Sequence, residues 1–267
     1  MTTHKTDQDS MARQAVVKAL LASGFPFQTA IAELAQQVTD CKVVTEEFPW
    51  RDDNGAGFLD LVVFKYDFIV AIECKKTQKE IFTFLQPAGA GEKVIRSRCL
   101  FLTQIYDQSM RLEMYCCDWE IKPNSLESMF CVVSTSDSGK DQRMLEKDAQ
   151  LLIRGADAFA RHFKQELKPK PAEEPDRVVV PLIVTNAKLF EAKYQPGNVS
   201  LETGQLPATA QPDISPIEWV RFRKAFSAGG DRGDRTVFVV AASSLQKFLD
   251  GLDKVSSSPF KGRVHVA

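Results

Sequence analysis

The chain has 267 residues, 44% hydrophobic and 26% charged, and its 34 Lys and Arg nearly balance 35 Asp and Glu to a formal charge of −1. These values are typical of a globular protein and exclude disordered or collagen-like chains. The balanced charge gives no overall sign of a polyanionic partner. No apolar run reaches the roughly 18 residues that a membrane span needs, so no membrane partner is expected. The polar first ten residues lack an apolar export segment, so we expect a cytoplasmic protein with reduced cysteines.

The cysteines and histidines do not suggest a metal site or a triad. The six cysteines show no C-x-x-C or Cys/His ligand spacing, and the three histidines are isolated. Any catalysis should therefore depend on carboxylates, Lys or Cys. The adjacent pair Cys116-Cys117 has no nearby His to act as a base, so packing is the preferred interpretation.

Hydrophobic periodicity predicts alternating helices and strands along the chain. The first 11 residues look like a loose tail, and the segment 168–176 is a proline-rich connector. The strand after the connector is expected to pair with the segment that follows it, and 195–216 to form a loop. The predicted helices are 11–21, 27–39, 140–167 and 244–252, and the predicted strands are 42–48, 58–65, 68–75, 98–104, 128–134, 177–185, 187–194 and 236–242.

This order of elements predicts an α/β or α+β fold with a central mixed sheet flanked by helices. We expect a flexible tail at 1–11, a core over 12–167, and a C-terminal α/β extension over 177–267. The strand that follows the connector is too hydrophobic to lie outside a core, so a single domain is favoured.

The informative segment is the hairpin formed by FLDLVVFK and FIVAIECK. Side chains alternate along a strand, so Glu73 and Lys75 share one face and Cys74 takes the other. A two-residue turn at 66–67 sets a register in which Asp60 falls opposite Glu73. Two carboxylates and an amine would then converge on one patch.

Such a patch has a physical cost, since neighbouring carboxylates repel unless a cation neutralises them. Oxygen donors suit Mg²⁺ or Mn²⁺, with Asp60, Glu73 and the backbone carbonyl of Cys74 as candidate ligands. Lys75 could position the attacking water or stabilise charge on a phosphate. The alternative is an exposed hairpin face with an ordinary ion pair. The apolar runs LVVF and FIVAI argue against it, because they suit strands that are covered on both faces.

Two segments also carry a resemblance: Leu59-Asp60-Leu-Val-Val, and Ala71-Ile-Glu73-Cys-Lys75-Lys76 after it. Together they resemble the signature of the PD-(D/E)XK nuclease superfamily. The resemblance implies a restriction-endonuclease-like core in the order α-β-β-β-α-β, Mg²⁺-dependent cleavage of DNA or RNA, and a role typical of bacterial defence. Carried over by position, Asp60 and Glu73 are metal ligands and Lys75 is the catalytic lysine.

The chain departs from this family at two places. Leu59 replaces the Pro of the motif, and Gln28 stands on the opening helix where many relatives carry a Glu. Either the enzyme relies on fewer carboxylates, or Glu33 or Glu47 substitutes. We expect Gln28, Glu33 and Lys76 to lie around the ligands, with Gln28 hydrogen-bonded to a metal-bound water because an amide is a poor Mg²⁺ ligand.

Two stretches have a local excess of basic residues. The loop after the hairpin carries Lys79, Lys93, Arg96 and Arg98, which could follow a phosphate backbone or simply form a solvated loop. The second stretch combines Trp219 and Phe222 with Arg221, Arg223, Lys224, Arg232 and Arg235. It could bind single strands by stacking, although a helix with its aromatic side chains packed inward is the preferred interpretation.

These patterns predict a Mg²⁺- or Mn²⁺-dependent nuclease, with DNA favoured over RNA. An RNA nuclease, and a catalytically silent member that binds nucleic acid or a partner, are the alternatives. The family resemblance also implies a homodimer. Because the sequence shows no motor or recognition domain, we expect a partner protein to supply specificity.

Overall fold

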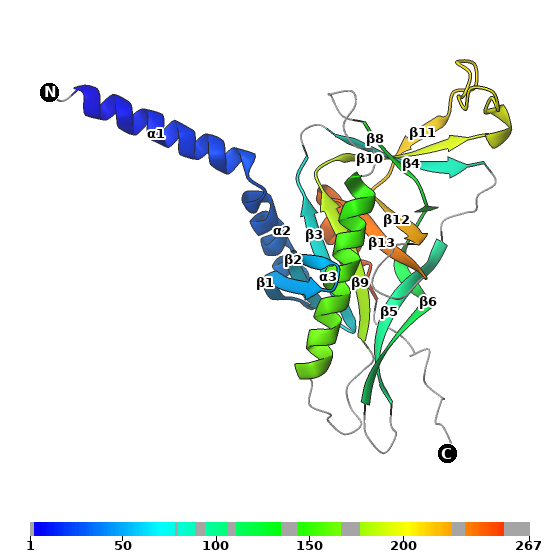
Figure 1. Ribbon diagram of the computed structural model, residues 1–267, viewed down its shortest axis with the longest axis horizontal. Helices are drawn as coiled ribbons and strands as arrows, with labels where there is room; N and C mark the ends of the chain where they lie inside the picture. Colours follow the sequence, from blue (N-terminus) through cyan, green and yellow to red (C-terminus); the bar gives the residue numbers. More distant parts are fainter. Residues whose placement is uncertain are drawn as a thin grey trace.

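The fold is built around the hairpin that the sequence predicts (Figure 1). The computed structural model describes residues 3–77, 80–88, 94–105, 111–134, 144–166, 177–225 and 233–253. Strands β2 (Gly55–Lys65) and β3 (Phe68–Lys75) pair antiparallel from Leu61↔Ile72 to Lys65↔Phe68. Tyr66 takes the left-handed conformation (φ 51°) in the two-residue turn. The predicted register is therefore confirmed.

A mixed sheet extends from both sides of this hairpin. Strand β1 (Cys41–Asp52) pairs antiparallel with β2, and β9 (Arg177–Thr185) lies parallel to β3. Beyond β9 come β13 (Asp234–Ala241), β12 (Trp219–Ala225) and the short β7 (Glu127–Ser128). A ribbon of β5 (Val94–Ile105) and β6 (Arg111–Ser125) joins the same sheet through β9.

A second, smaller sheet packs beside the first. Its order is β11 (Asp213–Pro216), β10 (Lys188–Tyr194), β4 (Ile81–Pro87) and β8 (Cys131–Ser134). Strand β10 runs parallel to β4, so it is not the partner of β9 that the sequence predicted. The prediction was wrong because Asn186 turns the chain away from β9: its side chain binds both the N–H and the C=O of Thr77, next to the start of β4.

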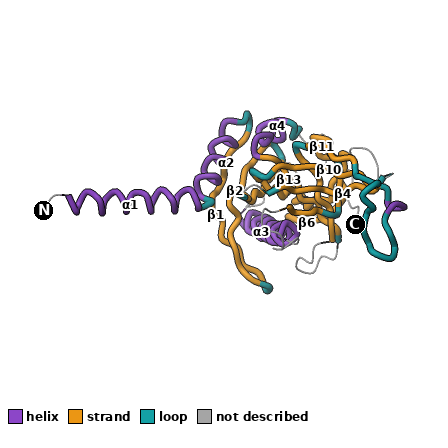
Figure 2. The backbone as a smooth tube through the Cα atoms, turned by 90° about the horizontal axis from the view of Figure 1, so that it is seen from above, coloured by secondary structure: helices purple, strands orange, loops and turns teal. Residues whose placement is uncertain are grey.

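Helices cover both faces of the large sheet (Figure 2). Helix α3 (Met144–Glu166) packs on one face, where Leu145, Leu152 and Phe159 join the first core cluster. Helices α2 (Phe25–Gln37) and α4 (Leu245–Asp250) pack on the other. This double cover explains why β9 is apolar along nearly its whole length. The structure thus has a mixed sheet flanked by helices, as predicted. Short 3₁₀ turns at Pro196–Asn198 and Ala242–Ser244 complete the described elements.

Helix α1 (Thr3–Ala22) extends away from the body in both views (Figures 1 and 2). It begins well before residue 11, so the prediction of a loose tail there was wrong as to secondary structure. Lys76 links the end of α1 to the body, because its Nζ donates to the carbonyls of Leu21 and Ser23 (2.9 Å for Ser23). Among the described helices none is by itself both long and apolar enough to cross a membrane. Only the bent pair Met11–Ala22 and Phe25–Gln37, at 56°, meets that test together.

Other predicted boundaries also shift. Between the hairpin and the long helix, the structure has β4 and β6 where the sequence predicted no strand, and β5 is longer than the predicted strand 98–104. The predicted strand 128–134 is divided between β7 and β8, which belong to different sheets. The connector 168–176 lies outside the described residues. No disulfide joins the six cysteines, all of which lie in the described part of the chain.

Candidate functional site

Asp60 and Glu73 meet at the end of the paired region of the hairpin. They occupy the next positions in the register after Leu61↔Ile72. The backbone N–H of Cys74 donates to Asp60 Oδ2 at 2.6 Å, which holds the Asp60 carboxylate against the start of the Glu73-Cys74-Lys75 segment. The predicted convergence of these carboxylates from two strands is therefore present.

The electrostatics of this pair are unfavourable without a cation. Burial, followed by the charges of Asp60 and Asp148, raises the pKa of Glu73 to about 8. Burial also raises the pKa of Asp60, and the charge of Glu47 adds to the effect, while the Cys74 N–H opposes it. Negative charge is thus concentrated here beyond what Lys75 compensates.

Lys75 reaches toward α3 and forms an ion pair with Asp148, with Nζ 2.6 Å from Oδ2. Both side chains are mostly buried, at 22% and 14% exposed. The sequence analysis missed Asp148. A signal was present, because Asp148 follows Leu145 by three residues and precedes Leu152 by four, which places a carboxylate on the apolar face of the helix.

Gln28 of α2 contacts both β1 and β2 at the site. Its Nε2 donates to Glu47 Oε1 of β1 at 2.7 Å and to the backbone carbonyl of Asp60 at 3.1 Å. Of the two candidate substitutes for a helical Glu, the structure brings Glu47 to this position. Glu33 lies five residues after Gln28, about 140° around α2, and is exposed. Lys76 binds the end of α1 instead of the carboxylates.

The donor set fits a small divalent cation. In the part of the chain that is described, no three His, Cys, Asp or Glu side chains close around one point as a cage. Mg²⁺ does not need such a cage, since it commonly takes one or two carboxylates and keeps several waters. Asp60, Glu73 and the Cys74 carbonyl offer only oxygen donors, and a bound cation would offset the burial and the neighbouring carboxylates that disfavour the ionised form of Glu73.

Of the four basic residues predicted to bind nucleic acid, the two that the structure describes do not lie at this cluster. Lys79 and Lys93 lie outside the described residues. Arg96 is 73% exposed, with Nε 4.0 Å from Glu120 Oε1. Arg98 pairs with Asp118 of β6 at 3.9 Å. Strand β5 borders β9 on the side opposite β3, so β9 separates both arginines from the hairpin.

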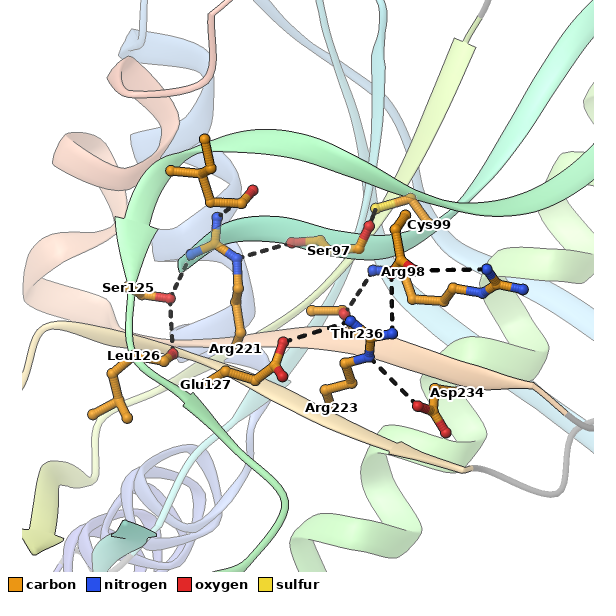
Figure 3. Close-up of polar contacts among 12 residues, drawn as sticks. Ser97, Arg98, Cys99, Ser125, Leu126, Glu127, Arg221, Arg223, Asp234 and Thr236 are labelled. Carbon is orange, nitrogen blue, oxygen red and sulfur yellow. Dashed lines mark hydrogen bonds and ion pairs between the residues drawn. The ribbon is translucent and has the colours of Figure 1, made fainter. Parts of the chain in front are cut away.

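The second basic stretch forms strand β12 and not a helix, with Arg235 at the start of β13 and Arg232 outside the described residues. Arg221, in the middle of β12, points inward (Figure 3). Arg221 is 0% exposed. Its guanidinium donates to Ser97 Oγ at 2.9 Å and Ser125 Oγ at 2.7 Å, and also to the carbonyls of Ile95 and Ile121. Burial lowers the pKa of Arg221 to about 10, so it stays charged at neutral pH. Arg221 fastens β12 to β5 and β6, so it is not available for stacking on a nucleic acid.

Comparison of the chain with protein-family models, with curated proteins and with solved structures finds no significant match.

Proposed function

We propose that the chain is a divalent-metal-dependent nuclease with a restriction-endonuclease-like core, most directly a DNA endonuclease. The observation that carries the proposal is the cluster at the hairpin, where Asp60, Glu73 and Lys75 come together from two adjacent strands. Two carboxylates and a lysine in this arrangement suit hydrolysis of a phosphodiester better than a structural role, because burial of the two carboxyl groups raises the pKa of each and so costs stability.

The order of elements supports the same proposal. The resemblance implies the core order α-β-β-β-α-β, and α2, β1, β2, β3, α3 and β9 occur in that order along the chain. Strand β9 lies parallel to β3, and α2 and α3 pack on opposite faces of the sheet. The second sheet is supplied largely by strands that come between β3 and α3, or after β9.

In this proposal the side chains divide the work. A bound Mg²⁺ or Mn²⁺ would polarise the scissile phosphate and lower the pKa of the attacking water. Asp60 and Glu73 would hold the cation, and the Cys74 N–H fixes the orientation of the Asp60 carboxylate. Lys75 would stabilise the negative charge that develops on the phosphate oxygens. The ion pair with Asp148 holds the Lys75 side chain toward α3.

The test is a panel of labelled duplex DNA, single-stranded DNA and RNA, incubated with Mg²⁺ or Mn²⁺. Asp60→Asn and Glu73→Gln should lose cleavage, while the matched controls Asp53→Asn and Glu46→Gln, at exposed positions of the same region, should retain it. Duplex cleavage establishes a DNase, and cleavage of RNA alone replaces DNA as the substrate. Full activity of Asp60→Asn and Glu73→Gln would overturn the proposal.

A further inference from the structure

We infer that helix α1 is the arm through which two copies of this chain associate, with the two α1 helices antiparallel. The helix extends away from the body of the protein in both views (Figures 1 and 2). The inference concerns association between chains, so it does not depend on the proposed nuclease chemistry.

The segment Met11–Ala22 of α1 is apolar and open to solvent. Every side chain in it is exposed, and nine of its twelve residues are Ala, Val, Leu or Met. The large apolar side chains of this segment, with one that follows it, are 53–72% exposed: Met11, Val16, Val17, Leu20, Leu21 and Phe25. A helix that is apolar around most of its circumference is normally buried, so this segment has the composition of a buried helix in an exposed position.

The exposed apolar area is large enough for a contact between two copies. Complete burial of one large aliphatic side chain removes about 60–120 Å² from water. The six side chains therefore offer about 200–450 Å² per copy, apart from the alanines of the segment. A symmetric contact uses the patch of both copies, which makes about 400–900 Å² of apolar surface. A standard interface buries about 1,200–2,000 Å², of which somewhat more than half is apolar, so α1 supplies much of what a stable dimer needs.

Lys76 fastens the base of α1 to the body, so the arm has a fixed direction. Its Nζ donates to the carbonyls of Leu21 and Ser23, at the end of the helix where unpaired carbonyls favour a cation. A segment that is already ordered loses less conformational entropy when it binds a partner. The arm is therefore preorganised for association.

The charges along α1 favour a second copy in the antiparallel direction. The polar residues 3–10 have a net charge of −1, and the apolar segment has one of +2; the charges belong to Lys5, Asp7 and Asp9 in the first part and to Arg13 and Lys18 in the second. Parallel helices place like charges side by side. Antiparallel helices with their apolar segments in contact instead direct residues 3–10 of each copy past the far end of the other copy's segment. Lys18 lies near that end and the Lys76 ammonium lies at it, so acidic residues of one copy approach basic residues of the other.

A lipid bilayer fits this helix less well. The apolar segment spans about 18 Å at ~1.5 Å per residue, which is short of the ~30 Å hydrocarbon core. Helix α2 does not extend it across a bilayer, because the apolar residues of α2 pack against the sheet. A helix that lies on a membrane surface needs one polar and one apolar face. In α1, Leu20 lies about 180° around the helix from Met11, so large apolar side chains point in opposite directions. A protein partner, which can cover more than one side of the helix, suits that distribution better.

The test is the mass of the full chain in solution, measured by sedimentation equilibrium over a range of concentrations. The wild type should be a dimer at micromolar concentration. Leu20→Glu and Val16→Glu should each weaken association about 30-fold or more, because each places a charge in the apolar contact. The matched control is Leu201→Glu, at a leucine outside α1 that is 99% exposed, and it should dimerise like the wild type.

Neutralising the acidic residues tests the direction of the pairing. The double variant Asp7→Asn, Asp9→Asn should associate about threefold more weakly than the wild type, because an antiparallel pair loses the attraction to Lys18 and Lys76. Added salt should weaken the wild-type dimer for the same reason. A parallel pair would instead be tightened by the double variant, since like charges would no longer oppose each other, and that result would overturn the antiparallel arrangement.

Association through any other surface would overturn the inference. A wild type that stays monomeric even at high micromolar concentration would do so, and so would a dimer that Leu20→Glu leaves intact. A monomeric wild type that sediments with vesicles of anionic phospholipid, in a way that Leu20→Glu abolishes, would overturn it in favour of a membrane. Glu73→Gln should dimerise like the wild type, because the hairpin carboxylates take no part in the contact. Circular dichroism verifies that each variant is folded.

Discussion

Replacing Glu73 with Gln should remove a pH-dependent loss of stability from the metal-free protein. Burial and the charges of Asp60, Asp148 and Glu47 raise the pKa of Glu73 from 4.5 to about 8, and Lys75 opposes them only in part. Between pH 4.5 and about 8, the folded state keeps the proton on the Glu73 carboxyl that the unfolded state releases. The unfolding free energy that Glu73 contributes is therefore fully present below its unfolded pKa and is lost as pH rises toward 8.

The magnitude follows from the width of that window. Each pH unit corresponds to about 1.4 kcal/mol, so the wild type should lose roughly 2.5 kcal/mol relative to Glu73→Gln between about pH 5 and pH 7. Urea unfolding followed by circular dichroism in EDTA measures the difference at each pH. Saturating Mn²⁺ should restore stability to the wild type and not to the variant. Parallel stability curves for the two proteins would refute the reasoning.

Three further substitutions, the last with a matched control, test the packing and the backbone. Arg221→Met should lower the unfolding free energy by about 3 kcal/mol or more, because it leaves two hydroxyls and two carbonyls without their buried donor, and a lower urea midpoint would show it. Gly155→Ala should cost about 1–3 kcal/mol in the same assay, since a Cβ there would lie 2.7 Å from Leu59 Cδ2. Glu47→Gly should leave the metal-free melting temperature unchanged or higher, because φ 53° suits glycine. Glu46→Gly, at a regular strand position, should instead destabilise by about 0.5–1 kcal/mol in the same melting experiment.

The hairpin could be predicted because its signals are local. Two apolar runs rich in Val, Ile and Phe flank a two-residue turn. The length of that turn fixes which residues of the two strands lie opposite each other. From this register alone Asp60 and Glu73 fall together. Alternation along a strand also places Glu73 and Lys75 on the same face, toward α3.

The remaining parts of the site come from other elements, and local patterns do not bring them together. Asp148 reaches Lys75 only because α3 packs across the hairpin. Glu47 lies opposite Asp60 because the register of β1 shifts between Val43 and Thr45, and no pattern in the sequence predicts that shift. The chain pairs β10 with β4 and not with β9, and this follows from Asn186 binding Thr77 across a long sequence separation. Strand β4 did carry a signal, since the buried Phe82 and Phe84 alternate with partly exposed positions.

The basic residues show how charge patterns can mislead. Arg221 and Arg98 belong to stretches with a local excess of positive charge, yet one is buried among neutral acceptors and the other is paired with Asp118. A count of charges along the sequence does not distinguish an arginine that binds a polyanion from one that fastens strands together.

The most direct test of the central claim is the fate of supercoiled plasmid with wild-type protein and with Lys75→Ala, each in Mg²⁺, Mn²⁺ or EDTA. Lys42→Ala, at an exposed position of β1, is the matched control, and circular dichroism verifies that each variant is folded. The account predicts that the wild type and Lys42→Ala nick or linearise the plasmid with a divalent cation, that EDTA abolishes cleavage, and that Lys75→Ala does not cleave. Metal-dependent cleavage that Lys75→Ala retains in full would contradict it.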